Sequence, residues 1–369
     1  MRIGIDACSL LSQPTGVGRV LKNLFRALSQ IDRENEYILF LNGESSNDPT
    51  LSHNFKRCKI TLPIVEKNFT WLHLRLPLAL FKDRVDLFHY TFYTMPFFIN
   101  CHSVVSIHDL SYELHPEWFS WRSQVSFRPF SRWAALQSRK IITYAGTTKR
   151  EIVKRYGVKE EKICVIYHGV DPKFQMEKES SKIETIKGAY GIQGRYILYV
   201  GNINIRRNVE RLLQAFRPFS ADYQLILVGK VEWPWIPLPR LIQDLNLIGR
   251  VIHLGYVEDD HLPILYNGAE VFVYPSLYEG FGLPVIEAMA CGTPVITSRS
   301  SALEEIYSDT AILVNPYRIQ EIEDALRTLL NDSRTRESCR ERGLALVKKF
   351  SWERAAQDTL KVYHEAFEA

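Results

Sequence analysis

Short apolar stretches alternate with amphipathic ones along the first half of the chain. Val20, Leu24 and Leu28, for example, recur at the spacing that places side chains on one face of a helix. The stretches rich in β-branched and aromatic residues have the length of buried strands, and they span residues 2–6, 37–41, 87–90, 104–107, 141–143 and 163–167. The pattern predicts strands that alternate with helices.

The same alternation restarts after a polar stretch at residues 172–190, whose composition is typical of a linker or an exposed connection. Apolar strands that alternate with helices indicate parallel sheets buried on both faces. The strands predicted in this half span residues 196–200, 224–228, 251–254, 271–274, 294–297 and 311–314.

Two such series predict an α/β protein with two doubly wound domains. We place the domains at residues 1–180 and 181–350 and expect one or two helices in residues 351–369, with Ser351 as the N-cap. A chain of 369 residues suits two domains of ordinary size. In such sheets ligands bind where the strands end, so motifs that follow strands are candidates for one site.

The composition is that of a globular protein, with 46% hydrophobic and 24% charged residues. No apolar run reaches the roughly 18 residues of a membrane span. The chain opens on the strand-like residues 2–6, and we therefore expect a cytoplasmic protein. The six cysteines form no C-x-x-C pair, which argues against zinc and for reduced thiols.

Charge and aromatic residues are unevenly distributed. Residues 1–180 carry 25 Lys and Arg against 18 Asp and Glu, whereas the remainder carries 21 against 24. Aromatic residues cluster in the same basic half, at 88–98 and 118–133. We favour core packing and an ordinary surface as the interpretation; contact with a lipid-linked acceptor or an anionic membrane is the alternative.

Two motifs of the first half follow predicted strands. Gly16-Val17-Gly18 leads into a helix, but Leu21 stands where a dinucleotide fingerprint needs its third glycine. These residues indicate either backbone N–H groups near a phosphate or a simple turn. His108 follows residues 104–107 and is a candidate contact to a sugar, the alternative being a structural histidine.

In the second half, Arg206 and Arg207 follow the strand at 196–200. Because guanidinium groups stay charged and bind phosphate in a bidentate way, the pair is a candidate for holding a diphosphate; a solvated helix start is the alternative. We interpret the acidic residues at 258–260 as helix-capping groups. The chain has no D-x-D triplet, so we expect no metal in the reaction.

The most specific motif is Tyr278 to Glu287, which reads YEGFGLPVIE. Glycines and a proline shape a turn that a ligand can approach, and the turn leads into a helix whose free N–H groups favour an anion. Glu279 lies before that helix, and we expect Glu287 in its first turn. Two acids beside an anion site suggest a ligand with both hydroxyl and phosphate groups.

The spacing of Glu279 and Glu287 resembles the E-x7-E motif of retaining glycosyltransferases of the GT-B fold, family 4. The resemblance covers nearly the whole chain. It includes Gly16–Gly18, His108-Asp109, His168–Asp171, Arg206–Asn208 and the block from Tyr274 to Thr297. It implies two Rossmann-like domains that face one another across a cleft. The family usually has Lys at position 207.

The resemblance also implies roles for single residues. Glu287 would bind the ribose hydroxyls and Glu279 the transferred hexose, while Arg206 and Arg207 would hold the diphosphate. The backbone around Gly255 would border the base, and His108 would touch the hexose. The expected catalytic residues are therefore His108, Arg206, Arg207 and Glu279. The expected donor-binding residues are Gly16, Val17, Gly18, Gly255, Val257, Gly280, Phe281, Gly282, Leu283 and Glu287.

The implied activity is transfer of a hexose, preferably mannose, from GDP-mannose or another nucleoside diphosphate sugar, with no cofactor. The expected acceptor is a glycan or a polyprenyl-linked molecule in cell-surface polysaccharide synthesis. We expect no nucleic-acid partner, and a peripheral contact with the inner face of the cell membrane through the basic N-terminal domain. Two alternatives stay open: a sugar-nucleotide epimerase on the same fold, and a non-catalytic GT-B-like binding protein.

Overall fold

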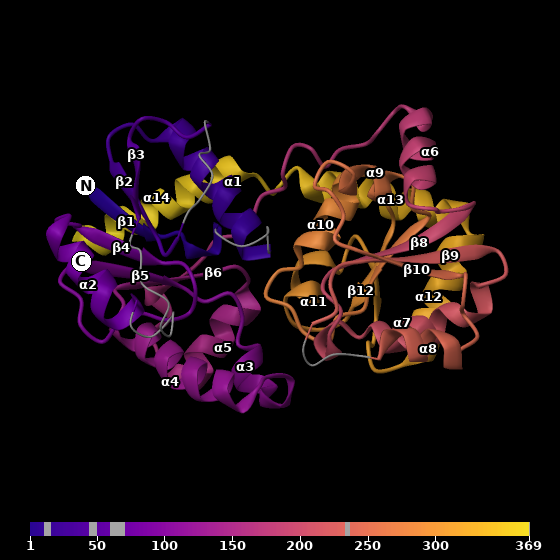
Figure 1. The fold of residues 1–369 in the computed structure, drawn as a ribbon, viewed down its shortest axis with the longest axis horizontal. Helices are drawn as coiled ribbons and strands as arrows, with labels where there is room; N and C mark the ends of the chain where they lie inside the picture. The colour runs from indigo at the N-terminus through magenta and orange to yellow at the C-terminus, as the bar shows by residue number, and fades with distance from the viewer. Residues whose placement is uncertain (11–15, 44–49, 60–70, 233–236, 369) are drawn as a thin grey trace. The chain divides into compact units, whose positions relative to one another are not determined.

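The computed structural model describes residues 1–369 except 11–15, 44–49, 60–70, 233–236 and 369. The chain divides into two compact units (Figure 1). Unit 1 comprises Met1–Gly169 and Ser351–Ala369, and unit 2 comprises Val170–Phe350. Each unit is built around one parallel sheet with helices packed on it. The predicted fold class of two doubly wound α/β sheets is confirmed.

Unit 1 contains a seven-stranded sheet in the order β3-β2-β1-β4-β5-β6-β7. The strands are β1 Arg2–Asp6, β2 Glu36–Leu41, β3 Phe55–Lys59, β4 Leu87–Tyr90, β5 His102–Ser106, β6 Lys140–Thr143 and β7 Ile163–Val165. The helices are α1 Gly16–Ile31, α2 Leu76–Lys82, α3 Ser111–Leu114, α4 Trp121–Gln137, α5 Gly146–Tyr156 and α14 Trp352–Glu368, with a π-helical turn at Trp71–Arg75 and 3₁₀ turns at Cys8–Leu10, Pro116–Trp118 and Glu160–Lys162.

Unit 2 contains a six-stranded sheet in the order β10-β9-β8-β11-β12-β13. The strands are β8 Arg195–Val200, β9 Tyr223–Val228, β10 Val251–Gly255, β11 Val271–Tyr274, β12 Val295–Ser298 and β13 Ile312–Val314. The helices are α6 Ser180–Ala189, α7 Val209–Phe216, α8 Leu238–Asp244, α9 Leu262–Asn267, α10 Leu283–Ala290, α11 Ser301–Tyr307, α12 Ile319–Asn331 and α13 Ser333–Val347, with 3₁₀ turns at Ile205–Arg207 and Arg217–Phe219.

The strand order reverses once in each sheet. Strand β1 pairs with both β2 and β4, and β8 pairs with both β9 and β11. The connections that leave the carboxyl ends of such a strand pair run to opposite sides and leave room for a ligand between them. The segments that follow β1 and β4 in unit 1, and β8 and β11 in unit 2, are therefore the positions where a site is expected.

All twelve predicted strands are present, but β3 was missed. Its sequence, FKRCK, contains three basic residues, and the strand lies at the sheet edge with β2 as its neighbour. An edge strand has no need of a continuous apolar run, so this segment lacks the pattern that identified the other strands.

The polar stretch at 172–190 is in part helical. Helix α6 occupies Ser180–Ala189 and buries none of its side chains, so the predicted exposure is correct although the segment is not simply a linker. The C-terminal tail forms one helix, α14, and the Ser351 hydroxyl accepts a hydrogen bond from the Arg354 N–H group at 3.1 Å, which confirms the predicted cap. Among the residues described, no helix has both the length and the apolar character to span a membrane.

Helix α14 is held in unit 1 by a buried polar network. His89 Nδ1 lies 2.8 Å from Tyr363 Oη of α14, and His89 Nε2 lies 2.8 Å from Ser106 Oγ. The Tyr144 hydroxyl donates to the same Ser106 oxygen at 2.9 Å. Burial lowers the pKa of His89 to about 3, so the imidazole is neutral in the folded protein. The network joins the last helix of the chain to the ends of three strands.

The neutral state of His89 predicts acid sensitivity. The unfolded chain takes up a proton at His89 below its ordinary pKa of 6.5, whereas the folded chain does not until about 3, so stability falls as pH decreases through that window. We expect His89 to account for a loss of about 2 kcal/mol between pH 6.5 and pH 5. Urea unfolding of wild-type protein and His89→Gln at both pH values measures this loss. The unfolding free energy of the variant should change less between the two pH values, because glutamine does not titrate.

The matched control for that experiment is His364→Gln, because His364 is exposed on the same helix that contacts His89. This variant should keep the wild-type pH dependence. An equal pH dependence in His89→Gln and wild-type protein would contradict the assignment of a buried neutral imidazole.

Gly169 lies where the chain leaves unit 1, directly against the start of α14. A Cβ atom at Gly169 would lie 2.2 Å from the Trp352 main-chain nitrogen and 2.6 Å from the Ser351 carbonyl carbon. Because the obstacle is backbone, we predict that Gly169→Ala destabilises the protein by about 1–3 kcal/mol. Gly188→Ala in α6 meets no atom within 4 Å and should be neutral or stabilising. Thermal unfolding of both variants tests this; equal midpoints would refute it.

Candidate functional site

Arg206 and Arg207 end the 3₁₀ turn that follows β8. The Asn204 side-chain oxygen accepts a hydrogen bond from the Arg207 N–H group at 3.3 Å, and the Arg206 carbonyl accepts one from the Leu277 N–H group at 2.8 Å. Asn208 takes a left-handed conformation with φ of 60° and ends this turn. The main chain that carries both arginines is therefore fixed to the segment after β11.

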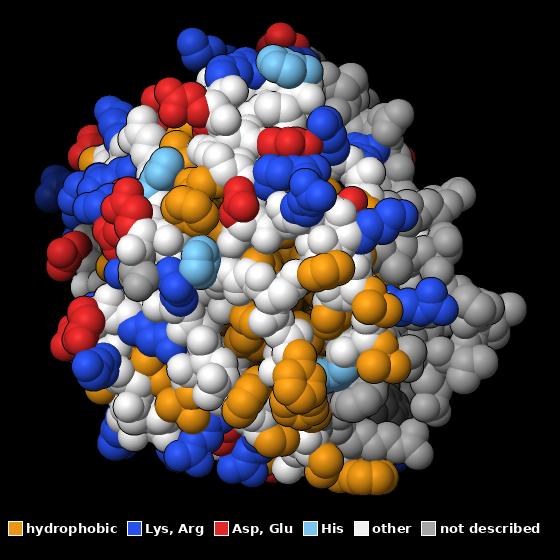
Figure 2. Space-filling model, turned by 90° about the vertical axis from the view of Figure 1, so that its left-hand side faces the viewer, with side chains coloured by type: hydrophobic (Ala, Val, Ile, Leu, Met, Phe, Trp, Pro, Cys, Tyr) orange, Lys and Arg blue, Asp and Glu red, His pale blue; other side chains and the backbone are white. Residues whose placement is uncertain are grey.

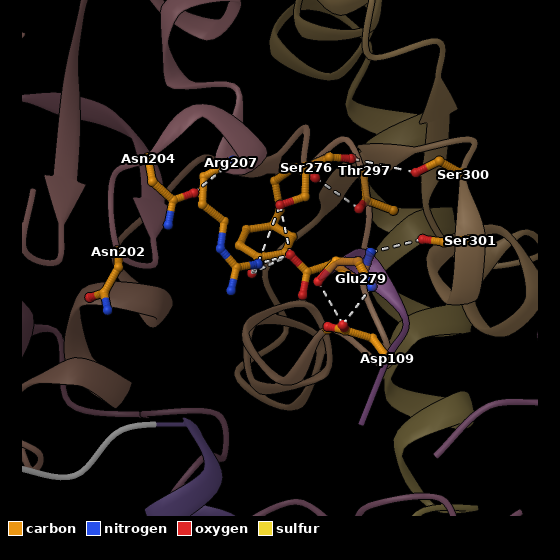
Figure 3. Close-up of polar contacts among 12 residues, drawn as sticks. Asp109, Asn202, Asn204, Arg207, Ser276, Glu279, Thr297, Ser300 and Ser301 are labelled. Atoms are coloured by element: carbon orange, nitrogen blue, oxygen red, sulfur yellow. Dashed lines mark hydrogen bonds and ion pairs between the residues drawn. The ribbon is translucent and has the colours of Figure 1, made fainter. Parts of the chain in front are cut away.

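Glu279 lies in that segment, and its carboxylate forms an ion pair with the Arg207 guanidinium (Figure 3). The same carboxylate oxygen, Oε1, accepts from the Ser276 hydroxyl at 2.8 Å and from the Tyr274 hydroxyl at 3.3 Å. Arg207 Nη1 also donates to the Tyr274 hydroxyl and, at 3.3 Å, to Ser276 Oγ. Only 8% of the Glu279 side chain and 16% of the Arg207 side chain are exposed. Both charges are thus largely shielded from water.

Three further hydrogen bonds hold the segments that carry this pair in place. The Ser301 hydroxyl accepts from the Glu279 main-chain N–H group at 2.9 Å, as Figure 3 shows. The buried Asn208 amide donates to the carbonyls of Pro275 and Pro316 at 3.0 and 2.7 Å. Sequence analysis did not identify the serines or Tyr274, although Tyr274 and Ser276 lie within five residues of Glu279.

One hydrogen-bond donor of the Arg207–Glu279 ion pair has no partner among the residues described. The Nε atom of Arg207 is buried and has no hydrogen-bond partner among the residues described. Leaving a buried donor unsatisfied costs about 1–3 kcal/mol, more for a charged group. The guanidinium thus binds a carboxylate through Nη1 and has a buried Nε donor without a partner among the residues described.

The turn after Glu279 leads into α10 as predicted. Gly282 is the N-cap, with φ of 92°, and a Cβ atom there would lie 2.6 Å from Leu303 Cδ2. The position therefore requires glycine. Gly280 is buried, and the Phe281 side chain packs against Tyr307 and Phe350. Leu283 is the first helical residue, where an N–H group has no intrahelical partner.

Glu287 lies in the second turn of α10, so the prediction of a first-turn position was wrong. The helix begins at Leu283, one residue before Pro284, and Glu287 is its fifth residue. The side chain is buried and accepts a hydrogen bond from the Tyr266 hydroxyl at 3.2 Å. Glu287 therefore lies one helical turn beyond the free N–H groups.

Gly255 ends β10, with φ of 64°, and its carbonyl accepts from the Gly229 N–H group at 2.7 Å. Val257 follows and buries its side chain, so only its main chain could meet a ligand.

The acids at 258–260 do not cap α9, because His261 is the N-cap residue and no side chain caps it. Instead, the Asp259 carboxylate oxygen Oδ2 lies 3.8 Å from Lys173 Nζ. In the described part of the chain, no group of three or more potential ligands could hold a metal ion.

In unit 1, Gly16, Val17 and Gly18 form the first turn of α1 and not a loop. Their neighbours Pro14 and Thr15 lie outside the described residues. Gly18 is buried against the body of the unit, whereas Gly16 is exposed, and a Cβ atom there would meet nothing within 4 Å. The first turn of α1 follows β1, one of the two strands where the sheet order reverses.

His108 lies just beyond β5, and its Nε2 atom is 2.8 Å from the Thr91 carbonyl oxygen. A carbonyl can only accept, so Nε2 carries the proton and Nδ1 keeps a lone pair. Burial lowers the pKa of His108, which keeps the imidazole neutral at pH 7. The side chain is packed among Tyr93 and Tyr144. His108 can therefore accept a hydrogen bond from a hydroxyl group.

Asp109, the residue after His108, has a structural role. Its Oδ1 atom accepts from the main-chain N–H and the hydroxyl of Ser111, at 2.9 and 2.7 Å, and the residue is buried. Those contacts hold the turn that follows His108. Thr91 was missed by sequence analysis because its contribution is a main-chain carbonyl, which carries no side-chain signal.

The predicted residues thus form two groups, one in each unit. In unit 2, Arg206, Arg207 and Glu279 lie where β8 and β11 end, and Gly280 to Leu283 continue from Glu279. In unit 1, His108 follows β5 and Gly16 to Gly18 follow β1. Each group lies in segments that leave the carboxyl ends of the sheet.

Two family sequence models match the chain. The model of glycosyl transferases group 1 matches residues 182–345, and that of glycosyltransferase family 4 matches residues 14–174. O-antigen chain mannosyltransferase B of Escherichia coli is 29% identical over 95% of this chain and 96% of its own length. The O-antigen chain mannosyltransferase RfbU of Salmonella typhimurium is 31% identical over 73% of this chain and 71% of its own length.

Solved structures share the fold. Sucrose-phosphate synthase of Thermosynechococcus elongatus superimposes with a TM-score of 0.81 at 22% identity, over 100% of this chain and 99% of the other. Anabaena HepE in complex with UDP and glucose gives a TM-score of 0.79 at 19% identity, over 98% and 99%. At such identities the likeness concerns the fold alone.

The buried pair predicts a large stability difference between two arginine variants. Arg207→Gln leaves the Glu279 carboxylate buried without its counter-charge, and we expect a loss of about 3 kcal/mol. Arg195→Gln breaks an ion pair with Glu270 whose arginine is half exposed, which should cost less than about 1 kcal/mol. Urea unfolding without ligand measures both; similar small losses would argue against a tight buried pair.

Proposed function

This chain belongs to the glycosyltransferases of family 4 and group 1, and from that premise we propose that it is a retaining, metal-independent hexosyltransferase. The hexose is mannose and the donor is GDP-mannose. The acceptor is a glycan or a polyprenyl-linked glycan in cell-surface polysaccharide synthesis. The relatives in Escherichia coli and Salmonella are named O-antigen chain mannosyltransferases, which supports mannose as the sugar and a polysaccharide as the product.

The observation that carries the proposal is the buried Nε donor of Arg207 beside Glu279, which has no partner among the residues described. A buried guanidinium with an unused donor fits an anionic oxygen, and the Glu279 carboxylate beside it fits sugar hydroxyls. Diphosphate and hexose are joined in a nucleoside diphosphate sugar, so one ligand satisfies both groups. Arg206 precedes Arg207 in the same turn and supplies a second positive charge.

Catalysis in this proposal is mainly electrostatic. When the bond between the sugar and the diphosphate breaks, negative charge builds up on the leaving diphosphate. Arg206, Arg207 and the first N–H groups of α10 stabilise that charge more in the transition state than in the ground state. Because these groups already provide fixed positive charge, and the chain has no D-x-D triplet, the reaction needs no metal.

The anomeric configuration is retained because the acceptor attacks the anomeric carbon from the face that the diphosphate leaves. The acceptor hydroxyl bonds to the anomeric carbon, the sugar–phosphate bond breaks, and the leaving phosphate oxygen takes the hydroxyl proton. Glu279 is already engaged in its pair with Arg207 and therefore suits positioning better than covalent attack.

A donor panel tests the proposal. Thermal shift with GDP, UDP, ADP and their sugars should give the largest rise with GDP-mannose, since a ligand at 100 times its Kd adds about 2.7 kcal/mol. Transfer to a mannose-terminated lipid acceptor, followed by NMR, should yield the α-anomer at a rate that EDTA does not change. UDP-glucose is the competing donor, because HepE was solved with UDP and glucose.

Three results would reject it. Stabilisation by UDP but not by GDP would reject guanine as the base of the donor. Donor conversion with no acceptor present would indicate an epimerase, and binding with no turnover over a broad acceptor panel would indicate a binding protein.

Arg206→Ala should reduce kcat about a hundredfold, because loss of one charge contact to the transition state costs about 3 kcal/mol. Steady-state kinetics with GDP-mannose measure this. The matched control is Arg217→Ala, an exposed arginine in the 3₁₀ turn that follows α7. The control should keep the wild-type rate, and near-normal turnover of Arg206→Ala would remove the arginines from the mechanism.

A further inference from the structure

The orientation of the His108 ring depends on more than its hydrogen bond. Its Nε2 atom lies 2.8 Å from the Thr91 carbonyl oxygen. That bond leaves the plane of the imidazole unfixed, because a carbonyl oxygen accepts over a broad range of directions and the last side-chain torsion of histidine has broad preferences. The Nδ1 lone pair lies in the ring plane, so this plane decides where a hydroxyl group can bind.

Aromatic rings supply the contacts that can fix the plane. The Tyr144 ring centroid lies 4.9 Å from that of His108, at an interplanar angle of 35°. The Tyr93 and Phe92 rings lie farther away, at 5.4 and 6.0 Å, and at steeper angles of 55° and 47°. Of the aromatic rings that the structure describes, Tyr144 is thus the nearest to His108 and the most nearly parallel to it. Rotation of the imidazole would drive its edge into the tyrosine ring.

Tyr144 is itself held at its hydroxyl group and at its ring. The hydroxyl donates to Ser106 Oγ at 2.9 Å, and the ring centroid lies 4.0 Å from that of His168. Ser106 Oγ also lies 2.8 Å from His89 Nε2, so the tyrosine belongs to the network that holds α14. Tyr144 is only 7% exposed. A ring with these contacts has little freedom, and it offers His108 a fixed surface to pack against.

The imidazoles around Tyr144 are kept from water. Figure 2 looks at unit 1 and shows histidine side chains at its surface. His89 and His168, by contrast, are only 2% and 5% exposed. Burial lowers the pKa of both, and also that of His108, where the Thr91 carbonyl and the Asp109 carboxylate oppose the shift. All these residues belong to unit 1, and the imidazoles are neutral at pH 7.

The loop beside His108 carries backbone strain. Tyr93 takes a left-handed conformation with φ of 55°, which is rare for a bulky aromatic residue and costs about 1–3 kcal/mol. Its main-chain N–H group donates to the Ser106 carbonyl at 2.9 Å. Ser106 therefore holds the main chain of Tyr93 and the side chain of Tyr144. Strain of this kind persists where the surrounding structure determines the geometry, and it is concentrated at functional sites.

A tyrosine that serves only the core adds stability and leaves the site unaffected. Here the packed ring, its bond to Ser106 and the strain at Tyr93 all act on one imidazole. We propose that Tyr144 is a positioning residue, which fixes the plane of the His108 ring and thereby directs Nδ1 at a hydroxyl group of the substrate. The kinetic consequence rests on the proposed function, whereas the packing of the ring does not.

NMR of the full chain with isotope-labelled histidine tests the proposal without donor or acceptor, and His108→Gln assigns the signals. Wild-type His108 should stay neutral and protonated at Nε2 at pH values below 6.5, its ordinary pKa. Tyr144→Leu removes the ring and admits water, so the pKa of His108 should rise toward 6.5 and both neutral tautomers should be populated. Tyr144→Phe keeps the ring and should keep the wild-type signals.

Steady-state kinetics with GDP-mannose give a second readout. Tyr144→Leu should lower kcat at least about tenfold, and Tyr144→Phe should stay within about threefold of the wild-type value, because a small misplacement of a polar group costs up to about a hundredfold in rate. Tyr144→Met also replaces the ring by an unbranched apolar chain, and it should behave like Tyr144→Leu. It replaces that variant if leucine prevents folding.

Tyr37 provides the matched control. It is fully buried in the same unit, its hydroxyl donates to Asp32 at 2.5 Å, and its ring stacks on that of Phe55 at 4.4 Å. Tyr37→Leu should lower the unfolding temperature much as Tyr144→Leu does, yet leave the His108 signals and kcat unchanged. Thermal unfolding shows that each variant is folded at the assay temperature.

Unchanged His108 signals and a wild-type kcat in folded Tyr144→Leu or Tyr144→Met would overturn the proposal. An equal loss of kcat in Tyr37→Leu would also overturn it, since the loss would then follow from lower stability. If the wild-type protein transfers sugar from no donor, the proposed function fails, and the NMR titration alone decides whether Tyr144 fixes the His108 ring.

Discussion

The candidate donor site depends on one buried electrostatic interaction, the ion pair of Arg207 and Glu279. A charge withdrawn from water must be paired, and these two residues lie 72 positions apart in the chain. They meet because β8 and β11 are neighbours at the point where the strand order reverses. The topology of the sheet thus decides which arginine can satisfy which glutamate.

The pair also explains the polar residues around it. Hydroxyl groups of Ser276 and Tyr274 share the carboxylate oxygen, and Ser301 binds the Glu279 main chain. Such contacts limit the directions that a carboxylate and a guanidinium can take. The Arg207 Nε donor has no partner among the residues described, and this donor and the N-terminus of α10 both favour negative charge. A preformed arrangement of this kind spends no reorganisation energy when charge develops on a leaving group.

Most of the fold could be predicted because the central strands are apolar on both faces. The edge strand β3 lacks that pattern and was missed. Glu279 and Arg207 could be identified from glycine, proline and arginine motifs that follow strands. Their hydroxyl partners could not, because those contacts depend on which strands are neighbours. The acids at 258–260 were misassigned for a related reason: a main-chain turn at His261 begins α9, and Lys173 pairs with Asp259.

The most direct test of the central claim is a crystal structure with a GDP-mannose analogue whose 2-fluoro group blocks transfer. We expect hexose hydroxyl groups within hydrogen-bond distance of the Glu279 carboxylate and a phosphate oxygen within hydrogen-bond distance of Arg207 Nε. Density for the sugar nucleotide elsewhere in the protein, with the Arg207 and Glu279 side chains unchanged and uncontacted, would contradict it.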